Sequence, residues 1–417
     1  MTAVPMPFSI TATKDPSSTR AIEPTAVADF AGLTVLHSLE NWLPLTETWL
    51  YNQICYLPSS ILSHAVSERR ENLEHFPFEK LHTLYQGRGY KLKWEGWLRK
   101  LGLRNYSGFK LRVARSIGAQ IVHSHFGDIA WQDIGIAKHG GLKHVATFYG
   151  HDVNRLPRTD PRWHYRYAEL FASVDRVFCE GPYMASSIVQ LGCPEHKVQV
   201  HHLGVAVEQI AYHPRNRTEG EPLRILIAGT FREKKGIPDA LRAVGELNRA
   251  VKVEATVIGG TTGESRSLVE EERIRKIIAD YNLSTRVRFL GFQPHAVLFA
   301  EAYKHHIFLS PSVTAEDGDT EGGAPVSIIE MSATGMPVVA TTHCDIPNVV
   351  LNGVSGLLAE EHDVTALVGH LQYLAEYPDR WGPMGNAGRE HIETEFNAMT
   401  QGMRLAAMYG ELDTASA

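Results

Sequence analysis

Residues 306–342 read HIFLSPSVTAEDGDTEGGAPVSIIEMSATGMPVVATT. Two runs in this stretch, HIFLSPS (306–312) and MPVVATT (336–342), have the apolar and β-branched composition that is typical of strands covered on both faces. Between them, the apolar residues of 326–334 are spaced as in a helix. A strand, a helix and a second strand in this order predict a parallel βαβ unit with a loop at the end of the first strand.

The same alternation extends in both directions along the chain. In the second half, further strands are expected at LRILIAG (223–229), VEATVIGG (253–260) and RVRFLG (286–291), and helices near 237–249, 266–280, 296–303 and 364–377. In the first half, the strand-like runs are LTVLH (33–37), SILSHAV (60–66), QIVHSHF (120–126), HVATFY (144–149), RVFCE (176–180) and KVQVHH (197–202). We therefore predict an α/β fold of two doubly wound, Rossmann-like domains facing a central cleft, where the carboxyl ends of both sets of strands meet.

Domain boundaries follow from composition. The segment YHPRNRTEGEPL (212–223) is polar, contains Pro and Gly and lacks periodicity, which is typical of a linker. The first residues are rich in Pro, Ser, Thr and Ala and offer little surface to bury. We expect a flexible tail at 1–28, a first domain at 29–212, a linker at 213–222, a second domain at 223–395, and a segment at 396–417 that packs back on the first domain.

Charge and cysteine content exclude several classes of protein. The 417 residues include 41 basic and 47 acidic side chains, a formal net charge of −6, so the chain lacks the positive field of a dedicated nucleic-acid binder. The four cysteines form no C-x-x-C pair, and no run of 18 or more apolar residues is present. These features favour a cytoplasmic protein.

The first candidate site is the loop GTFREKKG (229–236), which follows a predicted strand and precedes a predicted helix. Arg232, Lys234 and Lys235 would stand beside a helix N-terminus, which attracts anions through its free N–H groups. This arrangement suits a diphosphate leaving group. The alternative is a solvated basic turn.

The second candidate site runs from Glu321 to Glu330. Glu330 interrupts an otherwise apolar helix, where a carboxylate is costly unless it is paired or bonded to ligand hydroxyls. Glu321 precedes Gly322 and Gly323, which could let backbone N–H groups approach a ligand closely. The pair suits sugar and ribose hydroxyls, whereas the alternative makes Glu321 a surface acid and Glu330 a helix-cap partner.

Taken together, the motifs GTFREKKG, FLSPS, EGGAPVSIIEMSATGMPVVAT and IPNVVLNGVSGLL resemble those of the retaining glycosyltransferases of family 4, which have the GT-B fold. The resemblance covers about residues 33–397 and is strongest over 224–360. LPLTETWLYNQI (43–54) further resembles a stretch of family members that build bacterial exopolysaccharides.

The resemblance implies roles for the residues of the second domain. Lys235 matches the family lysine that binds the donor diphosphate, and Arg232 would replace the family arginine, whose position is held by Thr230. Glu330 matches the acid that holds the donor ribose. Glu321 is the nearest match to the acid beside the transferred sugar, although eight residues separate the two acids here and seven in the family.

The resemblance also implies roles in the first domain. Tyr149 stands where the family has a histidine beside the reaction centre, and His151 follows closely; either could act there, and core packing of Tyr149 is the alternative. His123 and His125 are expected to point toward the cleft, and the alternative is that they are structural histidines with satisfied hydrogen bonds. Thr46 would cap a helix at 47–57 whose N-terminus faces the donor phosphates.

Residues 88–115 combine nine basic side chains with one acid, Glu95, for a formal charge of +8, interleaved with Trp and Tyr. The basic residues are Arg88, Lys91, Lys93, Arg99, Lys100, Arg104, Lys110, Arg112 and Arg115. Basic residues mixed with aromatic ones suit peripheral contact with an anionic membrane. A solvated basic helix and a pocket for an anionic acceptor remain open.

We expect a retaining glycosyltransferase that moves a sugar from a UDP- or GDP-sugar to a glycan or lipid-linked acceptor in cell-envelope biosynthesis. No cofactor or metal is expected, because DGD (317–319) lies within the glutamate loop, where a structural part is favoured over Mg²⁺ binding. The alternatives are a nucleotide-sugar epimerase or hydrolase on the same fold, and a non-catalytic subunit that binds a nucleotide-sugar.

Overall fold

The structure is a computed structural model that describes residues 32–44, 47–84 and 107–414. The predicted tail at 1–28, Thr46 and most of the basic segment 88–115 lie outside these residues.

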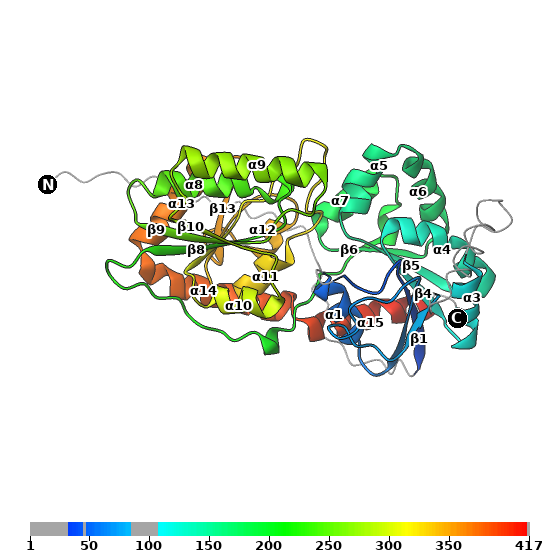
Figure 1. The fold of residues 1–417 in the computed structure, drawn as a ribbon. Helices are drawn as coiled ribbons and strands as arrows, with labels where there is room; N and C mark the ends of the chain where they lie inside the picture. The colour runs from blue at the N-terminus through cyan, green and yellow to red at the C-terminus, as the bar shows by residue number, and fades with distance from the viewer. Residues whose placement is uncertain (1–31, 45–46, 85–106, 415–417) are drawn as a thin grey trace.

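In the described part of the chain, the strands form two parallel sheets (Figure 1). The first has seven strands in the order β3-β2-β1-β4-β5-β6-β7, and the second has six in the order β10-β9-β8-β11-β12-β13. The strands of the first sheet are β1 Leu33–Ser38, β2 Ile61–Ser67, β3 Leu81–Thr83, β4 Ile121–His125, β5 Lys143–Phe148, β6 Arg176–Cys179 and β7 Val198–Val200. Those of the second are β8 Leu223–Ala228, β9 Val253–Ile258, β10 Val287–Gly291, β11 Ile307–Ser310, β12 Val338–Thr341 and β13 Gly356–Ala359.

The predicted α/β class and its two doubly wound sheets are confirmed. In both sheets the strand order reverses beside the first strand, the topology that places ligands at the carboxyl ends of the strands. Two short strands were not predicted, β3 and β13. Both stand at the edge of a sheet, where a strand has one neighbour and needs no long apolar run.

Helices cover both faces of each sheet (Figure 1). Around the first sheet they are α1 Thr48–Cys55, α3 Gly108–Ser116, α4 Gly127–Gly140, α5 Leu156–Thr159, α6 Arg162–Ser173 and α7 Pro182–Gln190. Around the second they are α8 Ile237–Leu247, α9 Ser265–Asp280, α10 His295–Ala302, α11 Val326–Ala333, α12 Ile346–Val349, α13 Val364–Glu376 and α14 Trp381–Glu395. None of the helices in the described ranges combines the length and the apolarity that crossing a membrane would need.

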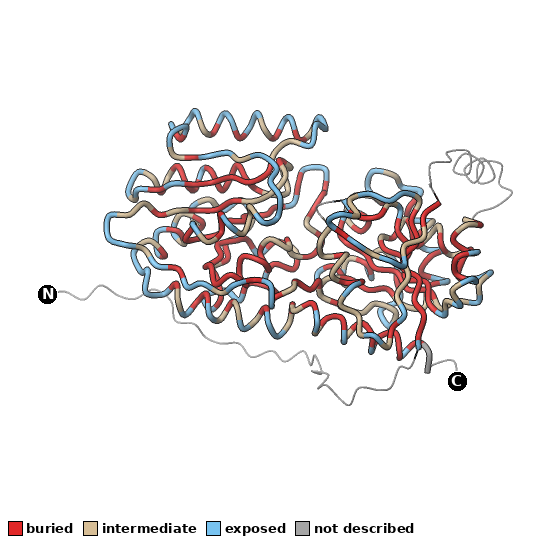
Figure 2. Tube along the Cα trace, turned by 60° about the horizontal axis from the view of Figure 1, so that its bottom comes forward, coloured by how far each residue is buried: buried red, intermediate tan, exposed pale blue. Residues whose placement is uncertain are grey.

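The apolar cores lie between the strands and these helices, and buried residues fill the interior of the molecule (Figure 2). The central strands β1, β4, β11 and β12 are buried along their whole length, whereas the edge strand β10 is mostly exposed. Successive residues of a strand point to opposite faces of the sheet. Val35 of β1 belongs to the apolar cluster that α15 covers, whereas Leu36 belongs to the cluster on the other face, with α3. In the second domain α8, α9 and α13 share one core, and α11 and α14 share the other. Both faces of each sheet are therefore closed, which leaves the strand ends free to carry a site.

The last helix, α15 Ala398–Thr414, lies against the first domain although it follows the second in sequence (Figure 1). Its residues Leu405 and Tyr409 are fully buried in one cluster with Leu33, Val35 and Phe178. The chain therefore crosses between the domains twice, and both crossings restrain how the domains sit on each other.

The segment 213–222 is partly packed on the second domain. Arg215 is 7% exposed, and its guanidinium donates to the carbonyl of His305 and to Thr334 Oγ1 at 3.0 and 2.9 Å. A buried guanidinium is tolerated here because carbonyls and a hydroxyl accept its N–H groups. Arg215 thus belongs structurally to the second domain.

Candidate active site

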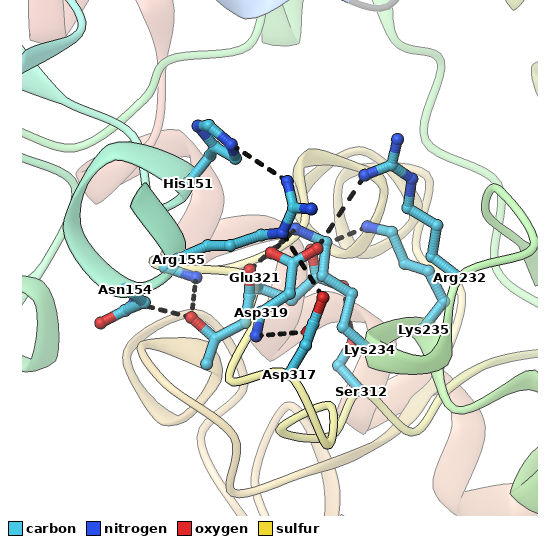
Figure 3. A network of polar contacts seen from close by, with 12 residues as sticks. His151, Asn154, Arg155, Arg232, Lys234, Lys235, Ser312, Asp317, Asp319 and Glu321 are labelled. Atoms are coloured by element: carbon cyan, nitrogen blue, oxygen red, sulfur yellow. Dashed lines mark hydrogen bonds and ion pairs between the residues drawn. The ribbon is translucent and has the colours of Figure 1, made fainter. Parts of the chain in front are cut away.

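The loop after β8 meets the loop after β11 where the two domains join. A short turn, η4 Glu233–Lys235, leads into α8, and Gly236 between them has a φ of +60°. A Cβ at Gly236 would lie 1.7 Å from the carbonyl oxygen of Pro311, so only glycine permits this approach. The close approach sets Lys234 and Lys235 beside the loop that carries Glu321 (Figure 3).

Lys235 and Glu321 form the centre of this group. Lys235 Nζ donates to Glu321 Oε2 at 2.8 Å, and Ser312 Oγ donates to Oε1 at 3.0 Å. The side chain of Glu321 is 6% exposed. Burial alone would raise the pKa of Glu321, but the charges of Lys235 and Lys234 outweigh it and hold this pKa below its ordinary value. Glu321 is therefore a buried, ionised acid and not the surface acid of the alternative interpretation.

Further cations gather around Asp319 (Figure 3). Lys234 Nζ lies 3.2 Å from Asp319 Oδ1 and also donates to the carbonyl of Thr320 at 2.8 Å. Arg232 Nη1 is 3.9 Å from Asp319 Oδ2 but pairs more closely with Glu264, at 2.8 Å. The structure thus brings Arg232, Lys234 and Lys235 together. Arg232 lies at the solvent-exposed edge of this group, where it pairs with the exposed Glu264.

Arg266 of α9 was not identified from the sequence. Its Nη1 lies 3.3 Å from Asp317 Oδ2 and 3.2 Å from Asp319 Oδ2. No local signal separates Arg266 from the other charged residues of α9, because its partners come from a distant loop. Both acids of the DGD segment are therefore engaged by basic side chains.

The first domain contributes His151 and Arg155, from the single-turn π-helix η1 His151–Arg155. Arg155 Nε is 3.4 Å from Asp317 Oδ2, and Asn154 donates to Thr320 Oγ1 at 2.7 Å. His151 Nε2 lies 3.3 Å from Arg155 Nη1. Burial and then the charge of Arg155 lower the pKa of His151. His151 thus reaches the group from the opposite domain as a neutral imidazole at neutral pH.

Tyr149 does not join this group. Its side chain packs against Trp49 and Phe126, with 8% of the residue exposed. The hydroxyl donates to Gln53 Oε1 at 2.8 Å and contacts His125 Nδ1 at 2.6 Å. The structure therefore favours the core-packing interpretation of Tyr149 and leaves His151 as the nearer of the two candidates.

The prediction that His123 and His125 point toward the cleft is wrong. Both residues are fully buried in the layer between the first sheet and α15. His123 Nδ1 lies 2.6 Å from the hydroxyl oxygen of Tyr409, and its Nε2 lies 2.6 Å from Thr147 Oγ1. The side-chain alternation of β4 turns these rings to the face that α15 covers, which the pattern of β4 alone does not reveal.

Among the described residues, His37, His123 and His125 are a group with the spacing of metal ligands. Hydrogen bonds account for both ring nitrogens of His123 and of His125 and for Nδ1 of His37. Tyr149 donates to Gln53, so it accepts from His125 Nδ1–H, and His125 Nε2 then accepts from His37 Nδ1–H at 3.1 Å. Burial lowers the pKa of His37 to about 3, which keeps the chain neutral. His37 Nε2 ends the chain as a buried atom without a hydrogen-bond partner.

Glu330 lies on α11 and is 5% exposed. Its Oε1 is 2.7 Å from Nε2 of His295, the first residue of α10. The hydrogen bond to Glu330 raises the pKa of His295 against the opposing effect of burial. The neighbours of Glu330 on α11 are apolar, so this pair lowers the cost of burying its carboxylate.

The two glycines after Glu321 lie against the first domain. Gly322 has a φ of +81°, and a Cβ there would be 2.3 Å from the Cα of Gly150. A Cβ at Gly323 would be 2.0 Å from Glu180 Oε2. Neither position has room for a side chain, so the EGG sequence permits the domains to meet directly beside Glu321.

Near Thr46 the structure differs from the prediction. Helix α1 begins at Thr48, and Glu47 occupies the N-cap position without a side-chain hydrogen bond. Burial raises the pKa of Glu47 to about 7. The predicted cap, Thr46, lies outside the described residues.

Within 88–115, Lys110 is not free to contact a membrane. It is 7% exposed, and its Nζ donates to Ser38 Oγ at 2.7 Å and lies 3.3 Å from Asp133 Oδ1. The amphipathic turn of α3 directs Lys110 inward and leaves Arg112 exposed. The charge available on this segment is therefore smaller than the sequence count.

Comparison with known proteins shows which family this chain resembles. The family model described as Glycosyltransferase Family 4 matches residues 68–209, and the one described as Glycosyl transferases group 1 matches residues 208–391. The amylovoran biosynthesis glycosyltransferase AmsK of Erwinia amylovora is 34% identical over 65% of this chain and 64% of its own length. The putative colanic acid biosynthesis glycosyltransferase WcaL of Escherichia coli is 30% identical over 71% of this chain and 72% of its own.

The fold is similar to that of Anabaena HepE, solved in complex with UDP-glucose, with a TM-score of 0.70, 16% identity, and coverage of 91% of this chain and 100% of that one. Sucrose-phosphate synthase from Thermosynechococcus elongatus gives a TM-score of 0.69 at 17% identity, covering 92% of this chain and 100% of that one. These likenesses, together with the two parallel sheets, establish the predicted GT-B fold. The sequence relatives and the consecutive family matches show that this chain belongs to the family 4 glycosyltransferases.

Proposed function

We propose that this glycosyltransferase moves a sugar from a nucleoside-diphosphate sugar to an acceptor hydroxyl with retention of configuration. The observation that carries the proposal is the group formed by Lys235, Lys234 and Glu321 at the domain junction, beside the N-terminus of α8. A helix N-terminus and two ammonium groups suit a leaving diphosphate, and an ionised acid suits sugar hydroxyls.

The proposed chemistry needs no carboxylate nucleophile. As the bond between sugar and diphosphate breaks, negative charge grows on the leaving phosphate oxygens, and Lys235 and Arg232 stabilise it. Glu321 accepts hydrogen bonds from the transferred sugar, and Glu330 accepts them from the ribose. On the same-face route, the departing phosphate takes the proton of the acceptor hydroxyl, so the protein contributes mainly charge and position. His151, neutral and close to Arg155, is placed to contact the sugar or the acceptor from the first domain.

We further propose that the reaction uses no metal ion. Asp317 and Asp319 are ion-paired with Arg155, Arg266 and Lys234, which leaves their oxygens less available to Mg²⁺. The basic side chains around these acids supply positive charge near the leaving diphosphate. Transfer that is unchanged by EDTA supports this part of the proposal, and transfer restored only by Mg²⁺ or Mn²⁺ contradicts it.

Cell-envelope exopolysaccharide synthesis in the cytoplasm is the proposed setting, on the basis of the relatives that act in amylovoran and colanic acid biosynthesis. The acceptor would be a growing glycan or a lipid-linked sugar. Basic residues of 88–115 would hold the enzyme at an anionic membrane surface, where a lipid-linked acceptor resides.

The experiment is a thermal-shift panel with UDP, GDP and ADP, followed by donor turnover with and without an envelope lipid extract. A diphosphate at 100 times its dissociation constant should stabilise the protein by about 2.7 kcal/mol. Transfer that requires the extract supports the proposal. Release of the nucleotide without any acceptor would instead indicate a hydrolase or epimerase, and binding without turnover would indicate a non-catalytic subunit.

A further inference from the structure

The backbone of Glu321 is held by a histidine that the sequence analysis did not identify. His343 follows β12 and is 1% exposed. Its Nε2 accepts the backbone N–H of Glu321 at 3.1 Å, and its Nδ1 lies 2.6 Å from Glu361 Oε1. The imidazole therefore bridges Glu361 to the loop that carries the acid of the site.

These contacts determine which nitrogen of His343 carries the proton. A backbone amide can only donate, so Nε2 must present its lone pair to Glu321. The thiol of Cys344 lies 3.1 Å from the same nitrogen and stays protonated, because burial raises its pKa to about 12. A neutral imidazole whose Nε2 carries no hydrogen is protonated on Nδ1. The Nδ1–H of His343 therefore donates a hydrogen bond to Glu361.

Glu361 is itself held in place. Its Oε2 accepts the backbone N–H of Thr314 at 2.7 Å, and its Oε1 lies 3.3 Å from Thr314 Oγ1. Thr314 belongs to the loop after β11, which also carries Ser312, the second partner of the Glu321 carboxylate. One carboxylate thus fixes the tautomer of His343 and anchors the start of the glutamate loop.

The hydrogen bond from the Glu321 backbone to His343 should matter most when a donor is bound. A diphosphate on Lys235 competes with Glu321 for the ammonium group, because both are anions. In the proposed donor complex the carboxylate would keep Ser312 and turn to the sugar, whereas the bond from the Glu321 backbone to His343 does not involve Lys235. The histidine is therefore the anchor that persists through the donor complex.

We propose that His343, oriented by Glu361, is a positioning residue. It fixes the backbone of Glu321 so that the Glu321 carboxylate can contact the transferred sugar. This inference rests on the proposed function of Glu321. It assigns His343 no contact with the substrate.

The test compares His343→Asn with His343→Gln. The Asn amide reaches the place of Nδ1 and can still donate to Glu361, but it leaves the N–H of Glu321 without an acceptor. The longer Gln can bring its amide oxygen to the place of Nε2. We expect His343→Asn to lower kcat about tenfold and His343→Gln to recover most of the loss, while the Kd for the nucleoside diphosphate changes less than about twofold in both.

Glu361→Gln provides a second variant should His343→Asn fold poorly. An amide cannot offer acceptors to both Thr314 and His343, so kcat should fall as in His343→Asn with nucleotide binding kept. The matched control is His362→Asn, since His362 Nδ1 also pairs with a carboxylate, Asp239 Oδ2 at 2.9 Å, but has no bond to the glutamate loop. This control should keep wild-type kcat.

Two results overturn the inference: wild-type kcat in both His343→Asn and Glu361→Gln, or an equal loss of kcat and nucleotide affinity in the two His343 variants. Glu321→Gln, measured in the same assay, separates this inference from the proposed function. If Glu321→Gln keeps wild-type kcat, the role proposed for Glu321 fails. If it loses kcat while the His343 and Glu361 variants do not, only the role of His343 fails.

Discussion

Lys235 and Glu321, 86 residues apart in the sequence, form an ion pair with Nζ and Oε2 at 2.8 Å. The pair joins the loop after β8 to the loop after β11, and both groups are predicted to contact the donor. In the absence of a donor each group compensates the charge of the other, which lowers the cost of burying the Glu321 carboxylate. Donor binding must therefore redistribute this pair, and the first two predictions follow from that requirement.

Lys235→Ala should weaken binding of UDP or GDP by about 1.5–3 kcal/mol through loss of a charge-assisted contact. Arg232→Ala should cost less, because Glu264 already holds its guanidinium. Isothermal titration calorimetry with each nucleotide measures both. Arg275→Ala removes an exposed ion pair with Glu271 on α9 and serves as the control. Wild-type affinity in Lys235→Ala would rule out the diphosphate assignment.

Glu330→Gln and Glu321→Gln should separate in their kinetics. Glu330→Gln should chiefly raise the Kd of the nucleotide, since its carboxylate is proposed to hold the ribose. Glu321→Gln should chiefly lower kcat, since its carboxylate is proposed to contact the transferred sugar. If both variants instead melt earlier without ligand and bind nucleotide normally, the two acids are structural.

The buried histidine chain should make stability depend on pH. Burial lowers the pKa of His37 to about 3, whereas an unfolded histidine has a pKa of about 6.5. Below pH ~6.5 the unfolded state binds more protons at this site, so the contribution of His37 to stability falls by about 1.4 kcal/mol per pH unit until the folded pKa is reached. Asp152 and Asp345 act in the opposite sense, because burial raises their pKa values to about 7 and about 6.

The comparison of wild type with His37→Asn isolates this effect. Asn can keep the donor to His125 and removes the titrating group. The free energy of unfolding of both proteins is measured in urea at pH 7.5, 6.5 and 5.5. As the pH falls below 6.5, wild type should lose more unfolding free energy than His37→Asn. A difference that stays constant across this range would mean that His37 takes up protons equally in the folded and unfolded states, so that burial does not lower its pKa.

Asp345→Ala should loosen the contact between the domains. Asp345 of the second domain accepts the backbone N–H groups of Tyr183 and Met184, at the N-terminus of α7 in the first domain, at 2.8 and 3.3 Å. Loss of such a cap costs about 0.5–2 kcal/mol. Small-angle scattering should show a larger radius of gyration. Asp363→Ala removes a cap within the second domain and should leave the radius unchanged.

The membrane proposal is tested by co-sedimentation with anionic and neutral vesicles across a salt series. Binding to anionic vesicles should weaken as the Debye length falls from about 10 Å at 0.1 M to about 3 Å at 1 M. The variant changes four basic residues to Gln: Lys91, Lys93, Arg99 and Lys100. Lys110 is left unchanged because it is buried against Asp133. Equal binding to both vesicle types, or to neither, would leave these residues as a solvated face or an acceptor pocket.

The two sheets and the position of the main loops could be predicted from the amino-acid sequence alone. Runs such as LRILIAG and MPVVATT identify buried parallel strands. A strand that is covered on both faces needs apolar residues at consecutive positions, and this pattern is visible in the sequence. The loops at 229–236 and 317–330 were located for the same reason, since each follows a strand and precedes a helix. Lys235 and Glu321 could therefore be named in advance.

Which side chains meet could not be predicted, because it depends on the packing of distant elements. Tyr149 turns its hydroxyl to Gln53 and His125, while Arg266 and His343 reach the glutamate loop from elements distant in sequence. Local periodicity reports whether a position is buried, but the partner of a buried polar group depends on how separate elements are packed. Hydrogen-bond pairing between separate elements is therefore set by the assembled fold and is not encoded in any single stretch of the chain.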